Sequence, residues 1–219
     1  MTAVRRIFLG VTGASGAAYA AAALRELTAA GYEVGLCASR AGAHVISHEF
    51  LLAGRDAPKD PDGVVREFVA RSAVGPGHVT ILGLDELTAP FASGSSLAPA
   101  ALICPCSGST LAAIAHGTGR NLIHRCADVM LKERRTLVLM TRETPLSLVN
   151  IENMATVTRA GAIVMPASPG FYNIPTDVNQ IVDFMVGKAL DHLGVPNRLL
   201  GRWGDDGMST VDESAEGAA

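Results

Sequence analysis

Two short segments combine glycine with hydroxyl side chains directly after apolar runs. Gly13–Gly16 contains Ser15 and follows the run Ile7–Val11, whereas Ser107–Thr110 follows the run Ala100–Cys104. Where such a bend opens a helix, its backbone N–H groups and the helix dipole favour a phosphate or another anion. A tight turn with a helix cap uses the same residue types, so one bend alone says little. Two bends that face one crevice favour an anionic cofactor.

Charged side chains that could act on a second anion lie in later segments. Arg142 and Glu143 come directly after the apolar run Thr136–Met140. Such a pair is either a structural ion pair or a phosphate clamp beside a group that carries protons. Arg125 and Lys132 are seven residues apart, which places them two turns apart on one face of a predicted helix. We therefore expect a positive patch on that helix.

Five further side chains have an ordinary structural explanation beside a functional one. Ser39 follows a predicted strand, where it either caps the next helix or joins the rim that carries Ser15. Glu49 and Lys188 lie on predicted helices, where charged residues are usually solvated. Tyr172 is exposed by a proline-rich loop, and Trp203 is the only tryptophan. From residue type alone these side chains do not indicate a site.

Metal chemistry is not indicated by the cysteines and histidines. The four cysteines have neither zinc-finger spacing nor a C-x-x-C pair, so buried free thiols are expected. His44 and His48 are four residues apart with Glu49 adjacent, but the order is not H-E-x-x-H and no third ligand is evident. We expect no bound metal.

Alternation of short apolar runs with helical patterns predicts an α/β fold. It is a Rossmann-like (flavodoxin-like), doubly wound and mostly parallel sheet in a single domain of three layers. In such sheets ligands bind beyond the carboxyl ends of the strands, where both bends would lie. The predicted strands are residues 7–11, 33–38, 79–84, 100–104, 136–140 and 162–165.

The 219 residues suit one domain, which we expect over residues 1–204. Residues 54–78 are rich in glycine, proline and charge and predict a long surface insertion, and residues 205–219 predict a disordered acidic tail. With 48% hydrophobic and 18% charged residues the chain is apolar enough to predict a homo-oligomer.

Charge and hydropathy exclude two classes of partner. The net charge of −3 provides no basic field for nucleic acid. No run reaches the roughly 18 apolar residues of a membrane span. We therefore expect a cytoplasmic protein whose partners are small molecules and other protein chains.

In combination, the motifs resemble those of the UbiX-type flavin prenyltransferases, and the likeness extends from about Ile7 to Trp203. Any one motif could occur by chance, but their order and spacing are specific. The motifs are Val11–Gly16, Pro105–Thr110, Ala127–Arg135, Arg142–Leu146, and Met165-Pro166 with Phe171-Tyr172.

The resemblance implies a metal-free transferase that binds FMN and assembles into trimers and dodecamers, with each site at a junction of subunits. Members of this family transfer a dimethylallyl group from dimethylallyl monophosphate to N5 and then C6 of reduced FMN. The product, prenylated FMN, serves a UbiD-type decarboxylase. The segment that includes residues 54–78 is longer here than is usual in the family.

The resemblance also implies roles for individual residues. Fixed cations would stabilise the departing phosphate, and a carboxylate would accept the proton lost on ring closure. FMN binding is implied for Gly13, Ala14, Ser15, Ser39, Ser107, Gly108, Ser109, Thr110 and Arg142. Catalysis is implied for Ser15, Glu49, Lys132, Glu143 and Trp203. Binding of dimethylallyl monophosphate is implied for Arg125, Lys132, Tyr172 and Lys188.

Two other functions fit the same fold. A flavin-dependent cysteine decarboxylase shares the fold and a similar second bend, but such enzymes typically carry a Pro-x-Met-Asn-x-x-Met-Trp stretch. Here the corresponding loop begins Met165-Pro-Ala-Ser-Pro-Gly-Phe-Tyr172. A non-catalytic FMN carrier would not need the set Lys132, Glu143, Tyr172 and Lys188. Both alternatives remain distinguishable from a prenyltransferase by assay.

Overall fold

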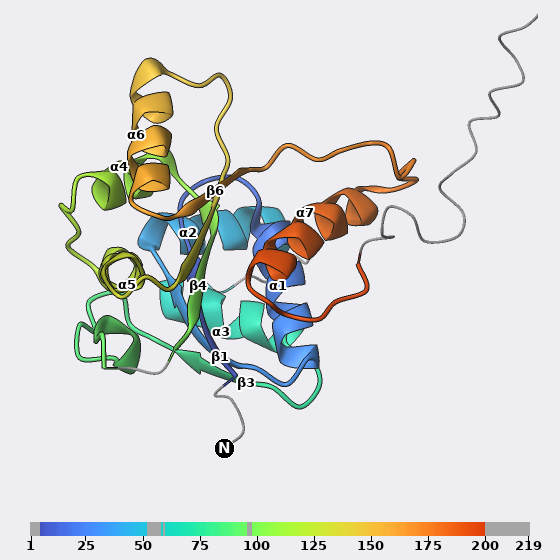
Figure 1. The fold of residues 1–219 in the computed structure, drawn as a ribbon. Coiled ribbons are helices and arrows are strands. Elements are labelled where there is room, and N and C mark those ends of the chain that lie inside the picture. The colour runs from blue at the N-terminus through green and yellow to red at the C-terminus, as the bar shows by residue number, and fades with distance from the viewer. Residues whose placement is uncertain (1–4, 52–57, 59, 96–97, 200–219) are drawn as a thin grey trace, which may run out of the picture.

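The computed structural model describes residues 5–51, 58, 60–95 and 98–199, which form a single sheet with helices on both faces (Figure 1). All strand pairs are parallel, in the order β3-β2-β1-β4-β5-β6. This is the strand order of a Rossmann-type doubly wound sheet, and it confirms the predicted fold class. The strands are β1 (Arg6–Val11), β2 (Glu33–Ala38), β3 (His78–Ile81), β4 (Ala100–Cys106), β5 (Thr136–Thr141) and β6 (Ile163–Pro166).

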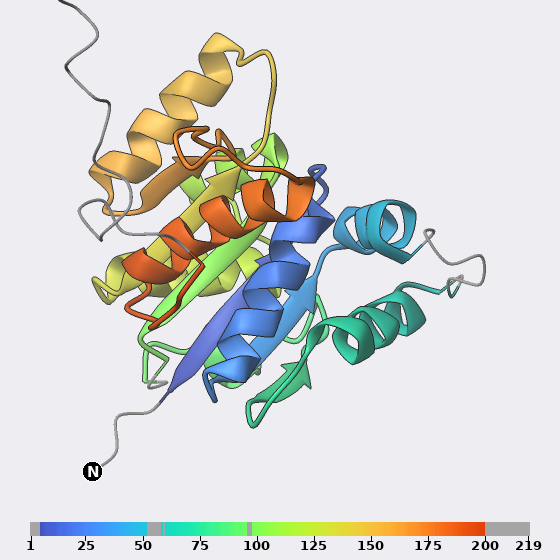
Figure 2. The ribbon, with the colours of Figure 1, turned by 90° about the vertical axis from the view of Figure 1, so that its right-hand side faces the viewer.

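Two hydrophobic clusters, one on each face of the sheet, give the three layers. Helices α1 (Ala17–Ala29), α2 (Arg40–Ile46), α3 (Pro61–Ser72) and α7 (Val178–His192) cover one face. Helices α4 (Gly108–Ala115), α5 (Leu122–Lys132) and α6 (Leu148–Arg159) cover the other, together with a short 3₁₀ turn at Pro90–Ala92. Figure 2 shows α1 and α7 side by side in front of the sheet.

The strands read as continuous apolar runs because both of their faces are buried. In β1, Ile7 and Leu9 pack into the cluster beneath α1 and α7, whereas Phe8 between them packs into the cluster beneath α5. All three side chains are at most 1% exposed. Parallel sheets covered by helices on both faces require this pattern.

Within the surface insertion at residues 54–78 the sequence also predicts a short helix near Val64–Ser72, and the structure has a helix there. Helix α3 lies within it, and the side chains of Val64, Val65 and Phe68 are buried in the core. Asp60 caps this helix by accepting from Gly63 N, and Pro61 occupies the first turn. The prolines and acidic residues that suggested a loop are therefore the start signals of a core helix.

Two predictions fall on residues outside the described part of the chain, and two others are limited to the described residues. Trp203 and the tail at 205–219 lie outside the part of the chain that the structure describes. Within that part, no helix is long and apolar enough to span a membrane, and no group of three His, Cys, Asp or Glu residues is placed to hold a metal. The cysteines are free and buried, and burial raises the pKa of the Cys106 thiol to about 12.

Candidate functional site

The two hydroxyl-bearing bends meet where β1 and β4 lie side by side. These strands are parallel neighbours, and the chain leaves the sheet in opposite directions from them, through β2 and through β5. Thr12 N donates to Pro105 O at 3.2 Å, which joins the first bend directly to the second. The structure thus brings Ser15 and Ser107 to one crevice at the topological switch point, as predicted.

The second bend opens α4 with a network of hydroxyl groups. The Ser107 side chain accepts from Thr110 N at 3.3 Å, and its Oγ lies 3.1 Å from the hydroxyls of both Ser109 and Thr110. The amides of Gly108 and Ser109 form the first turn, where N–H groups have no acceptor within the helix. This helix start keeps the donors that an anion needs.

The first bend is different, because a carboxylate already occupies the start of α1. Glu49 Oε2 accepts from Gly16 N at 2.8 Å and from Ala17 N at 3.0 Å. Gly16 has φ +130°, a conformation that favours glycine. At the start of α1, Glu49 therefore takes the place that a phosphate or another anion could occupy.

Glu49 lies in a turn of π-helix at Ser47–Leu51, which continues α2 and places the Glu49 carboxylate at the start of α1. Sequence periodicity predicted a regular helix through this region and gave no role to Glu49. Burial raises the pKa of Glu49, but hydrogen bonds from Gly16, Ser15 and Ala17 and the charge of Arg142 outweigh it and leave the pKa lowered. Glu49 is thus an anion held beside Ser15. The π turn that positions it is of a kind that often occurs at functional sites.

Ser39 lies on the same rim and also caps a helix, so both of its alternative roles apply. Its amide donates to Val11 O at 2.9 Å, and its hydroxyl accepts from Gly42 N at 3.0 Å. Helix α2 packs so closely here that a Cβ on Gly42 would lie 2.4 Å from Val11 O. A Cβ on Gly13 would lie 2.5 Å from the Ala41 side chain. The first bend is therefore held tightly against α2.

A cavity of about 240 Å³ opens beside the end of β5. Thr141 Oγ1 and Arg142 Nε are buried in this region without a hydrogen-bond partner among the described residues. Glu143 lies above the second bend, with its Oε2 3.9 Å from the position of a Cβ on Gly108. The residues that line the cavity are Thr141, Arg142, Glu143, Thr144, Pro145, Leu146, Met154, Pro166, Ala167 and Ser168. The predicted Arg-Glu pair thus belongs to the crevice of the two bends.

Tyr172 and Lys188 come together through an aromatic ring that the sequence interpretation missed. The Phe184 ring contacts Tyr172 edge-on, with centroids 5.5 Å apart, and Lys188 Nζ lies 6.0 Å from the same centroid. Phe184 and Lys188 are four residues apart on α7, a spacing that could have linked them. The loop that carries Tyr172 starts at the cavity, where Ala167 N donates to Thr141 O at 2.8 Å.

Lys132 does not join this crevice within one chain, and Arg125 lines a different cavity from Glu143. Lys132 ends α5 at the start of β5, whereas Glu143 follows its end. A strand of that length spans about 20 Å at about 3.3 Å per residue, so the two side chains lie at opposite edges of the sheet.

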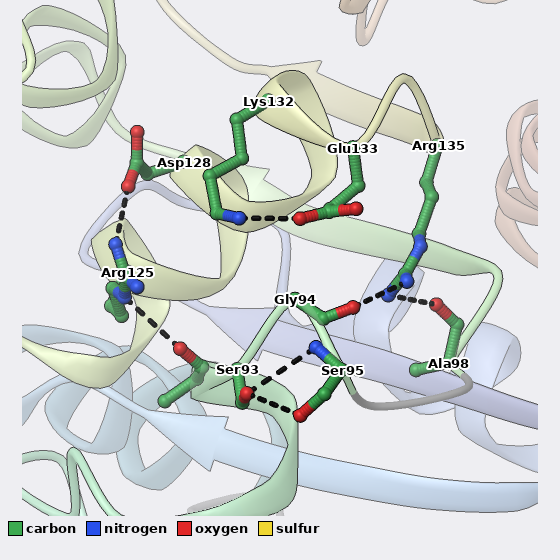
Figure 3. A network of polar contacts seen from close by, with 10 residues as sticks. Ser93, Gly94, Ser95, Ala98, Arg125, Asp128, Lys132, Glu133 and Arg135 are labelled. Atoms are coloured by element: carbon green, nitrogen blue, oxygen red, sulfur yellow. Dashed lines mark hydrogen bonds and ion pairs between the residues drawn. The ribbon is translucent and has the colours of Figure 1, made fainter.

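Within one chain, the cations of the predicted positive patch on α5 each pair with an acidic neighbour (Figure 3). Arg125 Nη1 lies 2.6 Å from Asp128 Oδ2, and its Nε donates to Ala92 O at 3.0 Å. Lys132 pairs with Glu133, and this hydrogen bond lowers the pKa of the exposed Glu133 carboxyl.

Comparison with known proteins gives a family and relatives that are all flavoproteins or flavin enzymes. The chain matches the Flavoprotein family over residues 1–190. It is 43% identical to the flavin prenyltransferase UbiX of Halalkalibacterium halodurans over 94% of this chain and 97% of that protein.

Two solved structures share the fold over most of the chain. A crystal structure of AnUbiX (PadA1) in complex with FMN and dimethylallyl pyrophosphate is 37% identical with a TM-score of 0.78, over 91% of this chain and 97% of that one. A dodecameric FMN-dependent UbiX-like decarboxylase from Escherichia coli O157:H7 is 34% identical with a TM-score of 0.76, over 90% and 100% of the two chains. The protein with the paired bends and the Arg142-Glu143 cavity therefore belongs to the flavoprotein family and, within it, to the UbiX-type flavin prenyltransferases.

Proposed function

We propose that the protein transfers a dimethylallyl group from dimethylallyl monophosphate to N5 and C6 of reduced FMN. The C–O bond to phosphate breaks as C1 of the isoprenoid bonds to N5, which loses its proton. The isoprenoid double bond then takes up a proton at C2 while C3 bonds to C6, and C6 loses its proton. Family membership supports the reaction. The observation that carries it for this chain is the Arg142-Glu143 cavity beside the second bend, which places a cation and a carboxylate next to an anion-binding helix start.

FMN fits the polar groups that the crevice leaves without partners. Buried polar atoms are rarely unpaired, and the Thr141 hydroxyl and Arg142 Nε both need partners from a ligand. The amides of Gly108 and Ser109 suit an anionic group, as the phosphate tail of FMN is. Bound there, FMN supplies the nucleophilic ring for alkylation. Binding would involve Gly13, Ala14, Ser15, Ser39, Ser107, Gly108, Ser109, Thr110 and Arg142.

The other side chains of the crevice suit an allylic phosphate. Ionisation of such a phosphate separates a carbocation from a phosphate dianion, which fixed cations and donors stabilise. Lys188 and Tyr172, held against Phe184, supply an ammonium group and a phenol for that dianion. Glu143 is placed to accept the proton released on ring closure, and Glu49 holds Ser15 in place beside the ring.

The site is completed by a second copy of the chain. Lys132 lies at the opposite edge of the sheet from Glu143, so it would reach an allylic phosphate only from another subunit. Arg125 lines a different cavity from Glu143 and would contribute from the same helix. Assembly would also cover exposed apolar side chains near the crevice. Leu148 and Val149 on α6 are 68% and 63% exposed, and Ile174 in the loop before α7 is 81% exposed. We propose a homo-oligomer, from trimer to dodecamer.

The product and its destination follow from the chemistry of the family. Prenylated FMN would pass to a UbiD-type decarboxylase, and free, buried cysteines suit a reducing compartment, in accord with a cytoplasmic enzyme.

Prenyl transfer is tested by anaerobic incubation of the protein with reduced FMN and dimethylallyl monophosphate, followed by mass spectrometry of the released flavin. The expected result is a mass gain of one five-carbon prenyl unit. Bound FMN without a mass gain would replace the proposal with a flavin carrier. Decarboxylation of a peptide that ends in cysteine would replace it with a cysteine decarboxylase.

A further inference from the structure

The hydroxyl of Thr12 lies between the two bends and bonds to both sides of the second one. Thr12 Oγ1 donates to Pro105 O at 2.7 Å and accepts from Ser107 N at 2.8 Å. The residue is 1% exposed, so water does not compete for these bonds. This buried hydroxyl thus adds two hydrogen bonds to the Thr12 N–Pro105 O bond that already joins the bends.

These bonds act on the residues that would hold the flavin, not on the sheet. Thr12 directly precedes Gly13, the first residue of the first bend. Ser107 caps α4, and its hydroxyl accepts from Thr110 N. A shift of Ser107 therefore moves the hydroxyl network and the free amides at the start of α4.

We infer that Thr12 is a positioning residue for the flavin site, which it holds in shape by fixing Ser107 and Pro105 relative to the first bend. The inference rests on the proposed function, because it assigns the two bends to FMN. The valine side chain has the shape of threonine but cannot donate or accept, so Thr12→Val leaves Ser107 N–H without its acceptor and Pro105 C=O with only the backbone N–H of residue 12. Thr12→Ser restores the hydroxyl.

Thr28, on α1, offers a matched control for the loss of a buried threonine hydroxyl. Thr28 is also fully buried, and its hydroxyl donates to Leu24 O at 2.8 Å and accepts from Val74 N at 3.0 Å. It lies at the far end of α1 from the bends. Thr28→Val therefore removes a comparable pair of hydrogen bonds without touching the flavin site.

The experiment measures the dissociation constant of FMN by fluorescence quenching, together with the melting temperature of each apoprotein. We expect Thr12→Val to weaken FMN binding by about tenfold or more, which is the usual effect of leaving a buried group unpaired, and Thr12→Ser to restore it. Thr28→Val should lower the melting temperature similarly and leave FMN binding unchanged. If Thr12→Val does not fold, Thr12→Cys, with its weakly bonding thiol, takes its place.

The possible results separate the inference from the proposed function. FMN binding by Thr12→Val within about threefold of the wild type, or an equal weakening by Thr28→Val, would overturn the inference alone, because a general loss of stability would then explain the data. No FMN binding by the wild-type protein would overturn both.

Discussion

The Glu49 carboxylate lies 2.8 Å from Gly16 N, where it closes the start of α1 from 33 residues away. Because of this contact, the two bends differ in the anion that they can bind. The first bend receives its anion from the protein itself, and the second keeps its amides for a ligand. Glu49 is also linked to Ser15 by a hydrogen bond, so the charge on Glu49 fixes a hydroxyl that faces the crevice.

Replacing Glu49 by glutamine tests the role of its charge. Glu49→Gln keeps an acceptor oxygen but removes the charge that favours a helix start, so we expect a loss of about 0.3 to 1 kcal/mol in the free energy of unfolding at neutral pH. Because the pKa of Glu49 is lowered on folding, its stabilisation is present above its ordinary value of 4.5 and is lost as the pH falls below it. Urea unfolding of both proteins on either side of pH 4.5 measures this. A difference that is equal at all pH values would contradict a charge effect.

The close packing of α2 against the first bend predicts an unequal response to two glycine substitutions. Gly42→Ala places a Cβ 2.4 Å from Val11 O, so backbone must shift and we expect a loss of about 1 to 3 kcal/mol of stability. Gly83→Ala meets only ordinary contacts, at 3.6 Å from Glu86, and should change stability by no more than about 0.5 kcal/mol. Urea unfolding of the apoproteins compares the two. Equal effects would show that α2 adjusts without strain.

The sequence was sufficient for the sheet and for the residues at its carboxyl edge. Buried parallel strands leave apolar runs, and the residues that follow each run must lie at that edge, so Ser15, Ser39, Ser107 and Arg142 were placed correctly. Helix α3 begins at Pro61, three residues before the predicted helix near Val64–Ser72, because the same residue types, proline and aspartate, mark both loops and helix starts.

What the sequence could not show depends on geometry between distant segments. The π turn that brings Glu49 to Gly16 has no local sequence pattern, and neither does the Thr12 hydroxyl that joins the bends. The positions of Arg125 and Lys132 were judged from their helix alone. Only the topology reveals that this helix ends at the edge of the sheet away from Glu143.

Removing the carboxylate of Glu143 should affect chemistry more than flavin binding. We expect Glu143→Gln to retain FMN and to lower the rate of prenyl transfer by about 100-fold or more, the usual contribution of a positioned base. Glu152→Gln, which changes an exposed glutamate on α6, is the control. Single-turnover mass spectrometry of the flavin gives the rate. A rate equal to that of the control would assign proton removal to another group, such as the released phosphate.

The distance between Lys132 and Glu143 along β5 predicts complementation between two inactive variants. Lys132→Ala and Glu143→Gln should each lose prenyl transfer alone, since each site would lack one of the two groups. The two variants are unfolded, mixed in equal amounts and refolded together. If each site takes these groups from two different subunits, random assembly then restores about a quarter of the sites. Prenyl transfer is then measured before and after mixing, with each variant refolded alone as the control. If both groups came from one chain, every site would carry a defect, and mixing would restore nothing.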